Sequence, residues 1–295
     1  MYQKNILKKY INKSELRIFN DKIKVRLSKE LTIKYDKGSY NNYLNHLQKC
    51  LDEIETLGIK YPANAHPVLY IYIVPDDNYG PLLRIPNFFD KGTGGAKPVP
   101  CYDIDGFNYA YGISQNLLED YSQKEVTVSK IVNDIHELTH MVHSLFFSLH
   151  QTIREGLAET VPLYVLDYEK QFTEHKDILN KMDDSQILTA REMLDSERKN
   201  IFGEEAILPD KSCSFRLSYI SSYLLIRGCV ETIVEKNKIS KTEAIQQFLE
   251  ILKQSDYTNE WLFWYIADTI GIPKNILLDG KEIQIKALNS IKAQN

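Results

Sequence analysis

The pattern of apolar and polar positions along the chain changes near residue 127. Before it, short stretches either alternate apolar and polar residues or concentrate β-branched and aromatic residues, as strands do. These predicted strands are Ile23–Leu27, Leu31–Tyr35, Val68–Val74 and Phe107–Ile113. One helix is predicted between Ser39 and Gly58, because apolar residues recur there on one helical face. Those residues are Tyr43, Leu44, Leu47, Leu51, Ile54 and Leu57.

After residue 127 the apolar period becomes that of helices. The spacing from Val128 to Leu145 predicts a long amphipathic helix. A second helix should begin near Thr152 and bend at Pro162, where proline removes a backbone donor. Further helical segments are predicted at Ser185–Asn200, Ser218–Lys236, Ser240–Gln254 and Thr258–Ile270. Ser240 followed by Glu243 has the capping-box spacing, which marks a helix start.

These elements predict an α+β fold in two parts. Residues 1–150 should form an N-terminal α/β subdomain with a small mixed sheet, and residues 151–295 a helical C-terminal subdomain. The segment Asp76–Pro100 is rich in proline and glycine and predicts a loop. The strand Phe107–Ile113 is a candidate sheet edge that could receive an extended peptide.

Composition narrows the functional class. The chain has 295 residues, 43% of them hydrophobic, which is typical of a globular protein. Its formal net charge of -4 offers no basic excess for nucleic acid or an anionic membrane surface. No apolar run approaches the length of a membrane span, and the N-terminus lacks the apolar region of a signal peptide. Cytoplasmic location is therefore the default prediction, with secretion left open.

The segment His136-Glu137-Leu138-Thr139-His140 carries the candidate chemistry. A spacing of four residues on a helix puts His136 and His140 on one face, where they can share a metal ion. Glu137 lies beside them, close enough to accept a proton from a water at the metal. This H-E-x-x-H pattern predicts one zinc ion per chain with Glu137 as the general base.

A third ligand is needed, because a catalytic zinc takes three protein ligands and keeps one open position. No downstream histidine follows the metzincin pattern, so a carboxylate is expected. Glu155 and Glu159 are both available on the next predicted helix. Their spacing of four residues can place one on the metal and the other on a ring nitrogen of a ligand histidine.

The two motifs together resemble the gluzincin group of zincin metallopeptidases. In that group an H-E-x-x-H helix is followed by a helix with the pattern E-G-x-A-E, which here reads Glu155-Gly156-Leu157-Ala158-Glu159. The resemblance implies a zincin-like fold, with Glu155 as the third ligand and Glu159 as a partner of a ligand histidine. The gap is shorter than in the aminopeptidase members, whose gap would land on Glu159.

The resemblance also implies an oxyanion donor and a substrate class. Gluzincins often use a tyrosine from a later helix to stabilise the oxyanion, and Tyr219, with Tyr223 as the second choice, matches its placement. Where aminopeptidase members carry G-x-M-E-N, this chain reads Gly112 to Asn116 with Gln115 in the glutamate position. Gln115 cannot pair with an amino terminus, which favours endopeptidase action.

The predicted function is therefore zinc-dependent hydrolysis of a peptide or protein substrate. One alternative is a zincin fold kept as a binding or regulatory protein without turnover. A second alternative is a non-haem iron enzyme, because two histidines and a carboxylate also suit Fe(II). Glu137 directly after His136 is better explained by hydrolysis.

Overall fold

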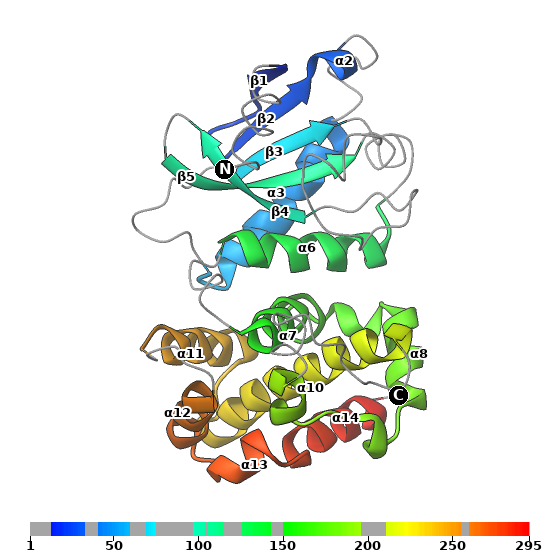
Figure 1. The fold of residues 1–295 in the computed structure, drawn as a ribbon, viewed down its shortest axis with the longest axis vertical. Coiled ribbons are helices and arrows are strands. Elements are labelled where there is room, and N and C mark those ends of the chain that lie inside the picture. The colour runs from blue at the N-terminus through cyan, green and yellow to red at the C-terminus, as the bar shows by residue number, and fades with distance from the viewer. Residues whose placement is uncertain are drawn as a thin grey trace. The chain divides into compact units, whose positions relative to one another are not determined.

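The computed structural model describes residues 13–32, 41–59, 69–74, 97–103, 106–114, 126–142, 150–195, 211–254 and 260–294. The chain divides into two compact units, Met1–Ser144 and Leu145–Asn295. The first unit combines a sheet with helices, and the second is helical in its described part (Figure 1). The fold class is therefore α+β.

The sheet of the first unit is five-stranded and mixed. Its strand order is β1-β2-β3-β5-β4. The inner pairs β2–β3 and β3–β5 are parallel, whereas β1–β2 and β4–β5 at the two edges are antiparallel. The strands are β1 (Ser14–Ile18), β2 (Ile23–Ser28), β3 (Leu69–Val74), β4 (Lys97–Asp103) and β5 (Gly106–Ser114).

The predicted role of Phe107–Ile113 as a sheet edge is wrong. Strand β5 contains this segment and pairs on both sides, with β3 and with β4, so its backbone groups are engaged within the sheet. The edge on this side of the sheet is β4, whose first residues, 97–100, were predicted as the end of a loop rich in proline and glycine. Proline is tolerated in edge strands, where one side of the backbone needs no partner.

The other strand predictions have mixed outcomes. The segments Ile23–Leu27 and Val68–Val74 correspond to β2 and β3. In contrast, Leu31 lies in a short helix α2 (Lys29–Thr32), so the start of the predicted strand Leu31–Tyr35 is wrong. Residues 33–35 lie outside the described residues, as do residues 76–96 of the predicted loop.

Among the described residues, the first unit has two helices longer than a single turn. Helix α3 (Asn41–Thr56) buries the predicted apolar face. Helix α6 (Val128–Val142) contacts α3 and strands β4 and β5 (Figure 1). The Thr127 hydroxyl accepts a hydrogen bond from the Lys130 amide at 3.3 Å, which caps the first turn of α6. Thus α6 begins where the apolar period changes.

The second unit is built around one long helix. In the described part of the unit, helix α10 (Lys211–Asn237) makes its main contacts with α7, α11, α12 and α14 (Figure 1). The elements are α7 (Gln151–Thr160), a π-helix η2 (Val161–Val165), 3-10 turns η3 (Tyr168–Lys170) and η4 (Asp184–Gln186), α8 (Thr173–Lys181), α10, α11 (Lys241–Gln254), α12 (Glu260–Ile270), α13 (Lys274–Leu278) and α14 (Glu282–Ala293).

The helix starts and the bend predicted from the sequence in this unit have different outcomes. The capping box before α11 is present, with Glu243 accepting from the Ser240 amide at 2.9 Å and Ser240 accepting from the Glu243 amide at 3.2 Å. The bend expected at Pro162 takes the form of η2. The predicted helix Ser185–Asn200 is interrupted at its start by a 3-10 turn and by residues 187–189, which have no regular secondary structure. Residues 196–200 of this prediction lie outside the described residues.

Among the described residues, one helical stretch is long and apolar enough to cross a membrane. It is Leu217–Asn237 of α10, and 72% of its most apolar window is buried inside the protein. A core helix surrounded by other helices passes the same test of length and composition, so the stretch is weak evidence for a membrane span.

Candidate metal centre

Helix α6 presents His136 and His140 on one face. The side chains of Val132, Ile135 and Leu138 are at most 3% exposed and anchor the helix in its unit. The two imidazole rings lie 4.5 Å apart between centroids and cross at 81°. Both histidines are buried, with 8% and 5% of their surface exposed. One turn of helix thus holds two nitrogen ligands in a region largely shielded from water.

Glu155 of α7 completes a group of three candidate ligands. Each residue of the group, His136, His140 and Glu155, offers one ligand atom. The three atoms lie within 4.8 Å of one another, and all three residues are buried. This group could hold a metal ion, and no other such group occurs among the described residues. Glu159 is described as well but is not part of it.

The donor set fits a divalent transition metal. Two imidazole nitrogens and one carboxylate oxygen are the ligands of several catalytic zinc sites. At the roughly 2.1 Å bonds of zinc to nitrogen and oxygen, tetrahedral donors lie about 3.4 Å apart. The ligand atoms of His136, His140 and Glu155 lie within 4.8 Å of one another, a spacing at which the group could hold a metal ion. The same donors also suit Fe(II), so geometry alone does not choose the metal.

A glycine next to the third ligand brings α7 against α10. A Cβ atom built on Gly156 would lie 2.4 Å from the carbonyl oxygen of Ser222 and 2.6 Å from Cγ1 of Ile226. Only glycine permits this approach, because any side chain would collide with the α10 backbone. The position of Glu155 in its unit is therefore set by a contact between helices.

The remaining predicted residues occupy different surroundings. Glu137 and Glu159 are half-buried on α6 and α7. Arg154 Nη2 lies 3.8 Å from Glu155 Oε1, which places a positive charge beside the candidate ligand. Gln115 lies outside the described residues.

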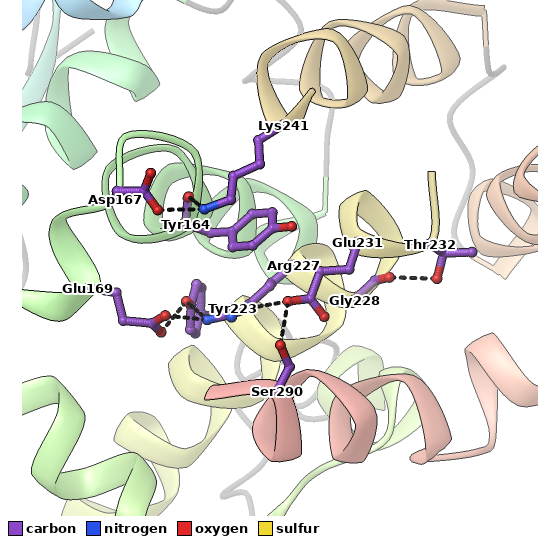
Figure 2. A network of polar contacts seen from close by, with 10 residues as sticks. All are labelled: Tyr164, Asp167, Glu169, Tyr223, Arg227, Gly228, Glu231, Thr232, Lys241 and Ser290. Atoms are coloured by element: carbon purple, nitrogen blue, oxygen red, sulfur yellow. Dashed lines mark hydrogen bonds and ion pairs between the residues drawn. The ribbon is translucent and has the colours of Figure 1, made fainter. Parts of the chain in front are cut away.

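The two tyrosine candidates on α10 differ in burial. Tyr219 is half-buried and lies three residues before Ser222, which faces α7, so that one helical turn separates them. Tyr223 is fully buried, and its hydroxyl donates to Glu169 Oε1 at 2.6 Å (Figure 2). Burial raises the pKa of Tyr223 well above its ordinary value, so its hydroxyl stays protonated.

Tyr223 belongs to a buried network centred on Arg227, which the sequence analysis missed. Arg227 is 0% exposed; its Nη1 donates to Glu169 Oε2 at 2.5 Å and its Nε donates to Glu231 Oε1 at 2.8 Å (Figure 2). Ser290 of α14 donates to the same Glu231 oxygen at 3.3 Å. The available signal was an Arg and a Glu four residues apart in the largely apolar middle of α10, since buried charges need partners.

The network also holds the π-helix that follows α7. The Arg227 guanidinium carbon lies 4.7 Å from the centre of the Tyr164 ring, and the Lys241 ammonium lies 4.3 Å from it. Lys241 also donates to the Tyr164 carbonyl at 3.0 Å (Figure 2). These contacts fix the chain just after the helix that carries Glu155.

Comparison of the chain with models of known protein families, with curated proteins and with solved structures found no match. Any assignment of function therefore rests on the residues themselves.

Proposed function

We propose that this protein is a zinc-dependent peptidase of the gluzincin type with a zincin-like fold. The observation that carries the proposal is the buried group of His136, His140 and Glu155, whose ligand atoms lie within 4.8 Å of one another. The H-E-x-x-H spacing on α6 and the close approach at Gly156 on α7 support the same conclusion.

In the proposed hydrolysis the metal and the general base have separate roles. When bound, zinc supplies a Lewis acid that polarises a scissile carbonyl and lowers the pKa of a water molecule. Glu137 is half-buried and follows a ligand directly, so it can accept the proton of the attacking water. It then delivers that proton to the leaving amine. An iron oxygenase would have no use for a base at this position, which favours zinc.

Tyr219 is the proposed donor to the oxygen of the carbonyl as it gains negative charge. A phenol hydroxyl suits this task because it donates a hydrogen bond without adding a full charge. Tyr219 is preferred over Tyr223, because the hydroxyl of Tyr223 already donates to Glu169 in the buried network. The substrate class is a peptide or protein, cleaved internally, since Gln115 offers no charge for an amino terminus.

Elemental analysis together with a peptide-library assay tests the proposal. Wild type should contain one zinc per chain and cleave peptides. Glu137→Gln should retain the metal and lose turnover by several orders of magnitude, because the metal ligands are unchanged while the base is gone. Full activity in Glu137→Gln would refute its role as base.

Two further outcomes would redirect the assignment. One zinc per chain without cleavage of any library peptide would identify a binding protein that has kept the fold. Iron as the metal recovered after aerobic purification would identify the oxygenase alternative instead.

A further inference from the structure

A buried polar cluster joins helices α3 and α6 within the first unit. At its centre is Asp134, which is 0% exposed. The carboxylate accepts a hydrogen bond from the Tyr43 hydroxyl at 3.1 Å and contacts His46 Nε2 at 2.9 Å. Lys130, one turn earlier on α6, forms a buried ion pair with the same carboxylate. We call these four residues the Asp134 cluster.

Three side chains of the cluster, from two helices, contact the Asp134 carboxylate. A buried carboxylate is costly unless it is paired and hydrogen-bonded, so Asp134 needs these three partners in place. The orientation of α6 about its own axis is consequently tied to Tyr43 and His46 of α3.

The cluster lies on the side of α6 away from the candidate metal ligands. Successive residues of an α-helix are rotated by about 100°, so the directions of Asp134 and His136 differ by about 160°. By the same rotation, the direction of His140 differs from that of Asp134 by about 120° in the same sense, about 40° from that of His136. Asp134 therefore cannot act as a ligand, and any influence on the metal passes through the position of the helix.

A cysteine beside the cluster raises the alternative of a Cys–His–Asp nucleophile. Cys50 Sγ lies 3.6 Å from His46 Nε2. However, the Cys50 side chain is 2% exposed, and burial raises the pKa of its thiol far above the usual range. A thiol that is protonated and closed to solvent does not serve as a nucleophile. The cluster is therefore assigned a positioning role.

We propose that Asp134 is a positioning residue that sets the rotation of α6 and thereby aims His136 and His140 at the metal. The inference rests on the metal site of the proposed function but not on peptide hydrolysis. Ligand nitrogens must be held within about 0.5 Å of their productive positions, so a small rotation of α6 is enough to weaken binding. Tyr43 and His46 act in the same way through Asp134.

The test uses Co²⁺ bound to the full-length protein, because its visible absorption reports ligand geometry as well as binding. Asp134→Asn should bind Co²⁺ about tenfold more weakly than wild type and show a changed spectrum. Tyr43→Phe keeps every charge and removes the hydroxyl that donates to Asp134, so it should fold even if Asp134→Asn does not. Its affinity should fall by roughly threefold.

A matched control separates positioning from general loss of stability. Ile54→Val removes one methylene from the buried face of α3 without touching the cluster. It should lower the unfolding temperature by an amount similar to Tyr43→Phe but leave Co²⁺ affinity and spectrum as in wild type.

The possible results decide between the two proposals. Wild-type affinity and spectrum in Tyr43→Phe and in any folded Asp134→Asn protein would overturn the positioning role while leaving the metal site intact. Equal weakening in Ile54→Val would also overturn it, because stability alone would then explain the effect. If wild type binds neither Co²⁺ nor zinc, the proposed function itself fails, and this inference fails with it.

Discussion

Replacement of Gly156 by alanine tests how α7 presents Glu155. The added Cβ would lie 2.4 Å from the Ser222 carbonyl oxygen, whereas ordinary contacts are 3.4 Å or longer. The obstacle is backbone rather than the end of a side chain, so no rotamer change removes the collision. Helices α7 and α10 must therefore separate by about 1 Å at this point.

Two opposing terms set the size of the effect. Alanine is a better helix former than glycine by about 1 kcal/mol, which by itself would stabilise α7. Overpacking of a tight contact costs about 1–3 kcal/mol. Because the contact involves two helix backbones, we expect the upper part of that range, leaving a net loss of about 1–2 kcal/mol. The displacement of about 1 Å between the helices exceeds the roughly 0.5 Å tolerance of a ligand site. Zinc affinity should therefore fall about 10- to 100-fold.

Urea unfolding of the metal-free protein measures the loss of stability in Gly156→Ala, and competition with a chelator measures its loss of zinc affinity. Gly228→Ala is a matched control, because its Cβ would lie 2.8 Å from the Ile283 carbonyl oxygen at the contact of α10 with α14. It should lose stability yet bind zinc within about twofold of wild type, since its contact is separate from α7. A Gly156→Ala protein as stable as wild type, with unchanged zinc affinity, would refute the reasoning.

Three further predictions concern single side chains. Glu155→Ala should weaken zinc binding by more than about tenfold while Glu159→Ala retains the metal, as elemental analysis would reveal. Tyr219→Phe should keep zinc and lower kcat by roughly 10²-fold, whereas Tyr223→Phe should lower the unfolding temperature because it breaks the Arg227 network. Burial raises the pKa of Tyr164 from 10.0 to about 12, so its contribution to stability should be complete below pH 10 and lost as pH rises toward 12. Unfolding midpoints measured across this range should decline less steeply in Tyr164→Phe than in wild type.

Elements defined by neighbouring residues could be predicted from the sequence. The apolar positions of α3 and α6 recur at helical spacing, and those of α3 are buried as predicted. The start of α11 is set by Ser240 and Glu243 through contacts three residues apart. In each case the interaction that fixes the element lies within one turn of helix, so the local pattern contains the information.

Features that depend on contacts between distant segments could not be predicted from local sequence patterns. The edge position of β4 follows from β5 pairing with β3, and nothing within either segment specifies that choice. The Arg227 network unites Glu169, Tyr223, Glu231 and Ser290 from η3, α10 and α14. A strand order and a network of this kind arise only when the chain has folded, because their partners are unrelated in sequence spacing.

The candidate metal group combines both kinds of information. The separation of His136 and His140 is set by one turn of α6, which is why their motif is recognisable in the sequence. Glu155 depends instead on the packing of α7 against α10, and the sequence records that packing through Gly156. A glycine inside a helix costs about 1 kcal/mol relative to alanine, so its presence indicates a contact that only glycine allows. The glycine therefore makes the second motif informative, since Glu155 and Glu159 alone would be two acidic residues on a helix.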